Sequence, residues 1–228
     1  MSEKTLVLIP ALNAERSVGA VVRDCLLVSR DVLVIDDGSS DRTGDAARKA
    51  GAQVIRHPVN RGKGAALKTG FAHALANGFD AVITLDADGQ HLPHEIPKFL
   101  AARMETGGDL IIGGRAHLFG KMLARRRFAN RFSARSIAFA SSAAITDSQS
   151  GFRLYSLHLL RSVRLRTDGF DLESEVIVCA GRRGFKVVTI PIELGFVDGL
   201  STSHYKPLVD TLRIFWTVTR ARYFWHSR

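Results

Sequence analysis

The sequence predicts an α/β fold: a mixed, mostly parallel sheet with helices on both faces, forming a single domain. Short β-branched runs at residues 5–9, 32–35 and 80–85 alternate with longer segments whose apolar residues recur at helical spacing. This alternation is typical of parallel sheets, in which helices connect one strand to the next. The chain has 228 residues and no internal repeat or low-complexity linker, which suits one domain with one substantial core.

The first part of the chain supports this fold element by element. After the first strand, residues 14–29 carry spaced apolar positions that predict a helix leading to the second strand. The expected order then continues with a helix at 41–51, a strand at 52–57, a helix at 62–78, a strand at 80–85, a helix at 93–108 and a strand at 109–114. Gly51 and Gly78 close two of these helices, a common position for glycine.

After residue 114 the composition changes. Between Leu110 and Thr146 the chain has no Asp or Glu. The basic residues there are Arg115, Lys121, Arg125, Arg126, Arg127, Arg131 and Arg135. We expect a helix across 120–145, a strand within 186–194, and an amphipathic helix in the C-terminal segment 207–228. That last helix could pack on the core or lie in a membrane interface, and its pattern leaves both open.

The charge of the chain indicates which classes of partner it binds. The net charge is +10 and the pI is about 10.2, which predicts affinity for nucleic acid, a membrane surface or phosphorylated small molecules. Nucleic acid is disfavoured, because the basic clusters lack interleaved aromatic residues and any DNA-binding motif.

Cysteine use and hydropathy bear on the compartment. Cys25 and Cys179 lie far apart, which disfavours a disulfide scaffold or a zinc site and favours a cytoplasmic setting. No segment approaches the ~20 uninterrupted apolar residues of a membrane-spanning helix, and the N-terminus lacks a signal-peptide layout.

Polar residues gather at the predicted carboxyl ends of the strands, where sheets of this class bind ligands. These residues are Asn13, Asp36, Asp37, Asp86, Asp88 and Arg115. Asp86 and Asp88, with Gln90 two residues on, offer oxygen ligands of the type that suits Mg²⁺ or Mn²⁺. The two carboxylates could equally cap the next helix, and the triplet alone does not decide between ligand and cap.

Two further motifs precede predicted helices. Asp36 and Asp37 end a strand before a Gly-Ser-Ser turn, where Ser40 or Asp41 can cap the following helix. Capping leaves the two adjacent acids at the strand end without a role. A glycine-rich loop that contains Lys63 opens the next helix, an arrangement that favours phosphate but lacks the spacing of a P-loop.

A set of short motifs occurs in an order that resembles glycosyltransferase family 2. The motifs are IPALN, VIDDGSSD, NRGKGAAL, LDADGQH, GGR, DSQSGFR and GFDLESE, and the match covers roughly residues 5–206. The chain looks most like the polyprenyl- and dolichyl-phosphate mannose synthases of that family. The resemblance implies a GT-A fold, a nucleotide-sugar donor such as a GDP- or UDP-hexose, a divalent metal, and inversion at the anomeric carbon.

The resemblance also implies roles for residues of the first part of the chain. At the nucleotide, these are Pro10, Asn13, Asp36 with its neighbour Asp37, and Lys63. At Mg²⁺ or Mn²⁺ on the donor diphosphate, they are Asp86, Asp88 and Gln90. The family usually has Asn-Glu after the first strand, whereas here Asn13 is followed by Ala14 and then Glu15. Whether Glu15 replaces the missing ribose-binding acid stays open at this point.

In the second part of the chain, the implied roles concern phosphates, sugar and acceptor. The residues implied to meet phosphate oxygens are Arg115 and Arg131, with His204 and Lys206 in a flap over the diphosphate. Those implied at the sugar and acceptor are Ser150 to Arg153, Glu173 and Glu175. For the two glutamates, the alternative interpretation is a solvated helix start.

The acceptor decides what chemistry the chain must supply. A metal with Arg and Lys stabilises the charge that develops on the departing diphosphate. A lipid monophosphate is already an anionic nucleophile, and the acid-free basic segment 110–146 suits it. A hydroxyl acceptor needs a carboxylate to take its proton, and Asp147 is the first candidate, with Glu173 second.

We therefore predict a metal-dependent inverting glycosyltransferase that moves mannose or glucose onto a polyprenyl phosphate. It would act at the cytoplasmic face of a membrane, with peripheral contact and no nucleic acid as partner. The alternative is the same donor chemistry onto a hydroxyl of a glycolipid or another small molecule. Residues 5–115 would bind the nucleotide sugar, 116–206 the acceptor, and 207–228 would form the amphipathic helix. A sugar-phosphate nucleotidyltransferase is disfavoured, because IPALNAE stands where its glycine-rich basic loop would be.

Overall fold

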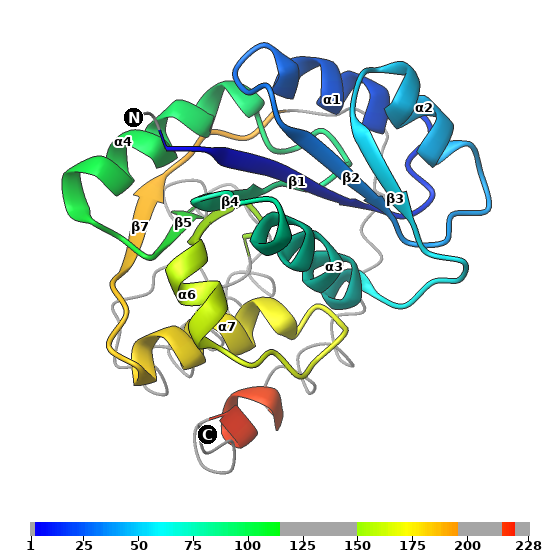
Figure 1. Cartoon of the computed structure of the whole chain (residues 1–228). Helices are drawn as coiled ribbons and strands as arrows, with labels where there is room; N and C mark the ends of the chain where they lie inside the picture. Colours follow the sequence, from blue (N-terminus) through cyan, green and yellow to red (C-terminus); the bar gives the residue numbers. More distant parts are fainter. Residues whose placement is uncertain (1–2, 115–149, 196–215, 222–228) are drawn as a thin grey trace, which may run out of the picture.

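The structure is a computed structural model that describes residues 3–114, 150–195 and 216–221. Its centre is a seven-stranded sheet. In chain order the strands are β1 (Thr5–Ala11), β2 (Val32–Asp36), β3 (Gln53–Arg56), β4 (Ala81–Thr84), β5 (Leu110–Gly114), β6 (Arg153–Ser156) and β7 (Val187–Pro191). In space their order is β3-β2-β1-β4-β6-β5-β7 (Figure 1).

The sheet is mixed and mostly parallel, as the sequence predicts. The pairs β1–β2, β2–β3, β1–β4 and β5–β7 are parallel, whereas β6 runs antiparallel to both β4 and β5. β6 was not predicted: it follows residues 115–149, which lie outside the described ranges, and enters the sheet between β4 and β5. The backbone N–H of Gly113 donates to the carbonyl of Phe152 at 2.9 Å, which secures the start of this strand.

Helices cover both faces of the sheet (Figure 1). On one face lie α1 (Val18–Leu26), α2 (Thr43–Lys49) and α4 (Ile96–Thr106), the last preceded by the 3-10 turn η1 (Pro93–Glu95). On the other face lie α3 (Lys63–Ala76), α6 (Leu157–Ser162) and α7 (Leu172–Arg182). α6 was not predicted, whereas α7 begins at the place where the sequence offered a helix start for Glu173 and Glu175.

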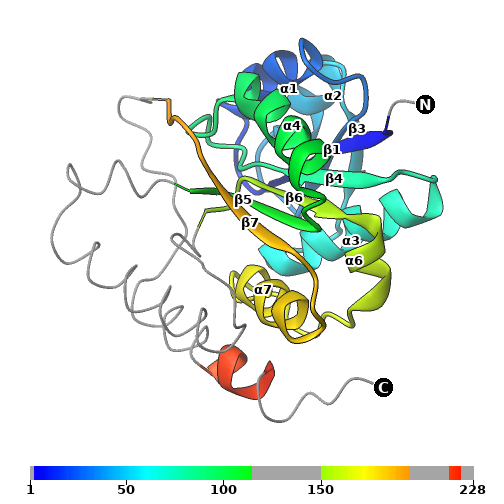
Figure 2. The same ribbon diagram turned by 90° about the vertical axis from the view of Figure 1, so that its left-hand side faces the viewer.

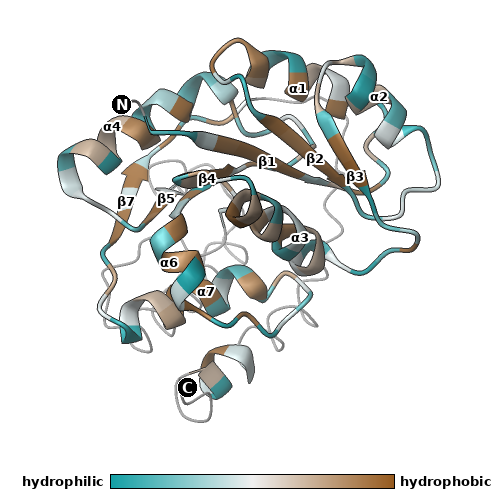
Figure 3. Ribbon diagram, in the orientation of Figure 1, coloured by the Kyte–Doolittle hydropathy of each residue, from teal (hydrophilic) through white to brown (hydrophobic). Residues whose placement is uncertain are grey.

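The alternation of side chains along each strand divides the core into two layers. Leu6 and Leu8 of β1 pack with α3, α6 and α7, whereas Val7 and Ile9 pack with α1 and α4. Successive side chains of a strand point to opposite faces, so a central strand covered by helices must be apolar throughout. Figure 3 shows this continuous apolar colouring along the central strands.

The first helix begins later than its apolar pattern predicts. The pattern suggests a start at residue 14, but α1 begins at Val18. The backbone N–H of Ala14 donates to Thr43 Oγ1 at 2.7 Å, and that of Glu15 donates to Asp41 Oδ2 at 3.1 Å. These contacts tie residues 14 and 15 to the loop after β2, ahead of the first turn of α1.

Part of the predicted C-terminal helix is described. Residues 216–221 are helical and lie beside α7 (Figure 2). Thr217 Oγ1 donates to Asp171 Oδ2 at 2.7 Å, and Val218 and Ala221 are buried in the core, whereas Trp216 is 60% exposed. The predicted helix at 120–145 and the rest of 207–228 lie outside the described residues. None of the described helices combines the length and apolar character required to cross a membrane.

Candidate active site

A cleft of about 640 Å³ opens at the carboxyl ends of β1, β2 and β4. This volume lies in the range of pockets that hold small molecules and cofactors. Its walls are residues 10–17, Asp37, Asp41, Asn60, Gly62, Lys63, Ala66, residues 86–88 and Phe170. The cleft therefore lies at the edge of the sheet where the sequence predicts a ligand.

The cleft brings together many of the predicted site residues. Those that line it are Pro10, Asn13, Glu15, Asp37, Lys63, Asp86 and Asp88. Others are described but are not part of its wall: Asp36, Gln90, Ser150 to Arg153, Glu173 and Glu175. Five predicted residues lie outside the described ranges: Arg115, Arg131, Asp147, His204 and Lys206.

A tight turn after β4 presents Asp86 and Asp88 to the cleft. The backbone N–H of Asp86 donates to His91 Nδ1 at 3.0 Å, and that of Gln90 donates to Asp88 Oδ1 at 2.9 Å. Gly89 adopts a φ of 80°, which favours glycine at this place in the turn. The backbone N–H of Gln90 thus supports the Asp88 carboxylate, and the role of the Gln90 side chain at the metal stays a prediction.

Lys63 lies between two carboxylates at the floor of the cleft. Its Nζ is 2.7 Å from Asp86 Oδ1 and 3.2 Å from Glu173 Oε1, and its side chain is 15% exposed. Burial lowers the pKa of Lys63, but the charges of Asp86 and Glu173 outweigh it and hold the pKa above its ordinary value. Lys63 is therefore an ammonium ion at neutral pH.

Gly151 leaves room for this ion pair. A Cβ at residue 151 would lie 2.9 Å from both Lys63 Nζ and Asp86 Oδ2. Those distances are too short for a side-chain carbon, so a larger residue at 151 would displace the ends of the Lys63 and Asp86 side chains. The DSQSGFR motif thus contributes a close backbone approach to the cleft.

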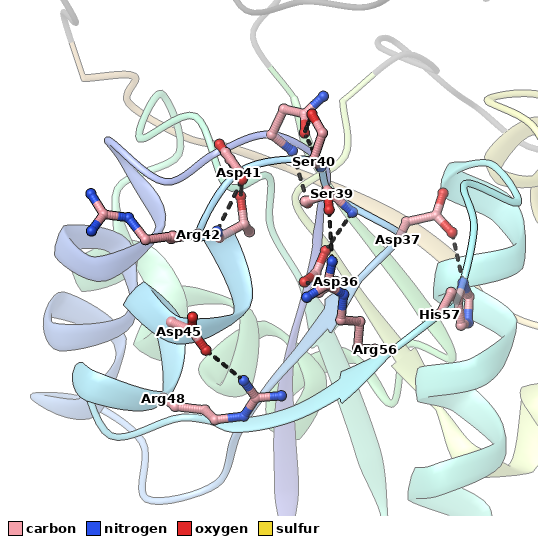
Figure 4. Close-up of polar contacts among 12 residues, drawn as sticks. Asp36, Asp37, Ser39, Ser40, Asp41, Arg42, Asp45, Arg48, Arg56 and His57 are labelled. Carbon is pink, nitrogen blue, oxygen red and sulfur yellow. Dashed lines mark hydrogen bonds and ion pairs between the residues drawn. The ribbon is translucent and has the colours of Figure 1, made fainter.

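Asp36 and Asp37 point to opposite sides of the sheet (Figure 4). Asp36 is fully buried: its Oδ1 accepts from the backbone N–H of Ser39 at 2.9 Å, and its Oδ2 lies 3.5 Å from Arg56 Nε. Asp37 lines the cleft and faces His57. Of the two acids, Asp37 is part of the cleft wall and Asp36 is not, and the nucleotide contacts expected for both stay predictions.

A buried polar network around Asp37 fixes the glycine-rich loop. Asp37 Oδ1 accepts from His57 Nδ1 at 2.6 Å and from the backbone N–H of Arg61 at 3.0 Å, and its Oδ2 accepts from that of Gly62 at 2.8 Å. The other ring nitrogen of His57 lies 2.9 Å from Thr69 Oγ1 on α3. No role for His57 was predicted from the sequence. Its only signal in the sequence is its place at a strand end, directly before the glycine-rich loop.

Glu15 is engaged at the rim of the cleft. Its Oε1 lies 2.8 Å from both Nε and a terminal nitrogen of Arg42, a side chain that is 79% exposed. Exposed ion pairs contribute only about 0–1 kcal/mol, so a ligand hydroxyl can displace Arg42 at low cost. Asn13 beside it, with a φ of 51°, accepts from the backbone N–H of Ser40 at 2.9 Å.

Arg153 and Glu175 support the site from behind. Arg153 is fully buried, and its guanidinium donates at 2.7 Å to the carbonyls of Ser150 and Glu173. Glu175 is also fully buried and accepts from the backbone N–H groups of Arg166 at 2.8 Å and Thr167 at 3.0 Å. The interpretation of Glu173 and Glu175 as a solvated helix start is wrong, because α7 turns this end toward the core.

The carboxylates of the cleft fit a divalent metal that arrives with a diphosphate. Within the described ranges, no three His, Cys, Asp or Glu side chains gather into a ready-made metal cage. Asp86 and Asp88 line the cleft one residue apart. Mg²⁺ commonly binds through one or two carboxylates together with substrate phosphates and water, and these two residues supply that share.

Comparison with known proteins identifies the family. The model of the family "Glycosyl transferase family 2" matches residues 6–164. The chain belongs to this family. This glycosyltransferase is 31% identical over 203 residues to the undecaprenyl-phosphate mannosyltransferase of Micrococcus luteus. The match covers 83% of this chain and 82% of that protein. It is likewise 31% identical over 211 residues to the polyprenol monophosphomannose synthase of Mycolicibacterium smegmatis, covering 84% of this chain and 77% of that one.

Solved structures confirm the predicted GT-A fold of this glycosyltransferase. One is the glucosyl-3-phosphoglycerate synthase of Mycobacterium tuberculosis in complex with Mn²⁺, UDP and phosphoglyceric acid. It matches with a TM-score of 0.77 at 20% identity, over 99% of this chain and 81% of that one. The predicted resemblance to polyprenyl- and dolichyl-phosphate sugar synthases is confirmed by the relatives, and so is the assignment as an enzyme.

Proposed function

We propose that this glycosyltransferase moves a hexose, mannose or glucose, from a GDP- or UDP-sugar to a polyprenyl phosphate. The observation that carries the proposal is the cleft of about 640 Å³ itself, whose wall includes Asp86 and Asp88 and in which Asp86 pairs with the ammonium of Lys63. Carboxylates with a neighbouring ammonium suit a metal-bound diphosphate. The two relatives named for lipid-phosphate mannosyl transfer support the acceptor.

The donor would lie along the cleft with its diphosphate at Asp86 and Asp88. These two carboxylates would hold Mg²⁺ or Mn²⁺, which when bound neutralises charge on the departing diphosphate. Lys63 adds a fixed positive charge on the same side. The part of the wall that is available to the nucleoside includes Pro10, Asn13 and Glu15. The family's ribose-binding acid is absent at Ala14, and we infer that Glu15 takes its place after it releases Arg42.

The acceptor chemistry follows from its charge. A lipid monophosphate attacks the anomeric carbon from the face opposite the diphosphate, which inverts that centre, and it needs no general base. A hydroxyl acceptor would need one, and Asp147 remains the proposed residue for that alternative. Glu173 is poorly suited, since it is 8% exposed and bound to Lys63. Arg115, Arg131, His204 and Lys206 remain the proposed phosphate contacts.

The proposed arrangement of the chain follows the same division. Residues 5–115 would bind the donor, 116–206 the acceptor, and 207–228 would contact the cytoplasmic face of a membrane. Trp216 supports that contact, because it is 60% exposed and lies 5.9 Å from the guanidinium of Arg220. Aromatic and basic side chains together suit an anionic membrane surface.

A product assay tests this function. Purified protein would be mixed with vesicles that contain polyprenyl phosphate and with GDP- or UDP-mannose or -glucose, with and without Mn²⁺. We expect a lipid-linked hexose only with metal, and a loss of about 100-fold or more in Asp88→Asn. Asp45→Asn, at an exposed carboxylate of α2, is the matched control and should retain activity.

Two other results would change the assignment. If the sugar appears only on hydroxylated lipids, the hydroxyl alternative replaces the lipid phosphate. If none of these sugar nucleotides gives a product or raises the melting temperature of the protein, the proposed function fails.

A further inference from the structure

The ion pair between Lys63 and Asp86 occupies the carboxylate that the proposed function assigns to the metal. Lys63 Nζ lies 2.7 Å from Asp86 Oδ1, within hydrogen-bond distance. A carboxylate oxygen that holds an ammonium cannot ligate a metal at the same position. One oxygen of the first of the two proposed ligands is therefore engaged by a positive charge.

A second carboxylate is available to the same ammonium. Glu173 Oε1 lies 3.2 Å from Lys63 Nζ, and its side chain is 8% exposed. The backbone of Glu173 is fixed by the buried Arg153, and that of Lys63 begins α3, where Ala65 N–H donates to the carbonyl of Asp168 at 3.1 Å. The ammonium can thus leave Asp86 while it stays with Glu173.

The ammonium of the pair is largely enclosed, whereas the Asp86 side chain is 33% exposed. The side chain of Lys63 is 15% exposed, the ring of Phe170 lies 5.7 Å from its Nζ, and Gly151 packs against it on the far side. Enclosed charges are screened little by solvent. The competition between ammonium and metal for Asp86 is therefore stronger than it would be on the surface.

We propose that Lys63 is an internal counter-ion of Asp86 that couples metal binding to donor binding. In the free enzyme Lys63 neutralises Asp86, so the metal alone binds weakly. When the donor diphosphate is bound, Lys63 remains with Glu173 and gains a phosphate oxygen as its new partner, and Asp86 becomes available as a ligand. The inference rests on the proposed function, because it assumes a metal-bound diphosphate at Asp86.

Metal binding without catalysis tests the coupling. Mn²⁺ affinity would be measured by electron paramagnetic resonance of the unbound ion, with UDP, with GDP and with neither, for the wild type and Lys63→Gln. In the wild type we expect the diphosphate to raise Mn²⁺ affinity by about 5–150-fold, the usual size of such couplings. In Lys63→Gln we expect tighter binding of Mn²⁺ alone and a smaller gain from the diphosphate.

Lys68→Gln is the matched control. Lys68 is also on α3 and pairs with Asp168 at 2.6 Å, but it is not part of the cleft wall. This variant should keep both the affinity for Mn²⁺ and the gain from the diphosphate. Glu173→Gln provides a second test in case Lys63→Gln does not fold: with Asp86 as the remaining carboxylate partner of the ammonium, Mn²⁺ alone should bind more weakly than in the wild type.

The outcomes separate the inference from the function. A wild type that binds Mn²⁺ more tightly with a diphosphate, with Lys63→Gln showing the same gain, overturns the role of Lys63 and leaves the proposed function standing. The same holds if removal of Lys63 tightens Mn²⁺ binding equally with and without diphosphate, since that is a simple field effect. A wild type that binds no Mn²⁺ under any of these conditions overturns both.

Discussion

The substitution Asp37→Asn tests whether the buried network behind the cleft holds this part of the fold together. Asp37 accepts hydrogen bonds from His57 Nδ1 at 2.6 Å, from Arg61 N–H at 3.0 Å and from Gly62 N–H at 2.8 Å. Asparagine has the same shape but offers one oxygen and one NH₂ group. Whichever way its amide is turned, the NH₂ faces at least one of these donors.

The expected cost follows from those contacts. The less harmful orientation keeps the oxygen toward His57 and Arg61 and opposes the NH₂ to the N–H of Gly62, which keeps Asn60 Oδ1 as an acceptor at 2.9 Å. The main loss is therefore one hydrogen bond to a charged group, which contributes about 1.5–3 kcal/mol. We expect Asp37→Asn to lower the free energy of unfolding by about 1.5–3 kcal/mol. For a domain of this size, that corresponds to a fall in Tm of about 3–12 °C.

Urea unfolding followed by circular dichroism, without nucleotide or metal, measures this quantity. Asp45→Asn is the matched control, because Asp45 pairs with Arg48 on the surface at 64% side-chain exposure. The control should change the free energy of unfolding by less than about 0.5 kcal/mol. If Asp37→Asn is as mild as the control, the network does not stabilise the fold and the reasoning is refuted.

Three further predictions concern packing and titration. Gly70→Ala should lower the free energy of unfolding by about 1–3 kcal/mol, because its Cβ would lie 2.3 Å from Leu8 Cδ1. Gly19→Ala, whose Cβ would have no contact under 3.5 Å, should instead raise it by about 0.5–1 kcal/mol. Equal urea midpoints for the two variants would contradict this difference. Burial, with a smaller effect of Asp24, raises the pKa of the Cys25 thiol to about 12, so peptide mass mapping should find it unalkylated by iodoacetamide at about pH 8 in folded protein and alkylated in urea. Burial likewise raises the pKa of Glu175 above 4.5, because its effect exceeds that of the hydrogen bonds that lower this pKa. The protonated form of Glu175 therefore contributes stability that is lost as pH rises through the folded-state pKa. Unfolding free energy measured over a pH series from 4.5 upward should therefore fall less in Glu175→Gln, and parallel curves would contradict the assignment.

The parallel part of the sheet could be predicted because its strands have a clear pattern in the local sequence. The runs that form β1, β2 and β4 are apolar, β-branched and bounded by polar residues, and the structure buries them on both faces. β6 has no such signal. Its four residues, Arg153 to Ser156, are all buried, and a strand that begins with a charged residue is stable only because two carbonyls accept from that guanidinium. Those partners come from residues that only the tertiary fold brings near.

The site shows the same limit. The sequence predicts that acids at strand ends line a cleft. It does not predict which of two adjacent acids does so. Because strand side chains alternate, Asp37 shares the α3 face with Ile35, while Asp36 points toward α2. The choice depends on which face carries the cleft. The contact between Lys63 and Glu173 was also out of reach, since it depends on how α3 packs near α7.

The antiparallel strand β6 has a consequence for how this enzyme can vary. β5 and β6 are hydrogen-bonded neighbours, with Ile112 opposite Arg153, so residues 115–149 are topologically the connection of one long hairpin. Both ends of that connection are fixed by the sheet. This segment carries Asp147, which we propose for a hydroxyl acceptor, while the described wall of the cleft comes from residues 10–88 and Phe170. We therefore expect that the segment can be exchanged between two adjacent points of attachment while the carboxylates and the lysine of the cleft keep their places.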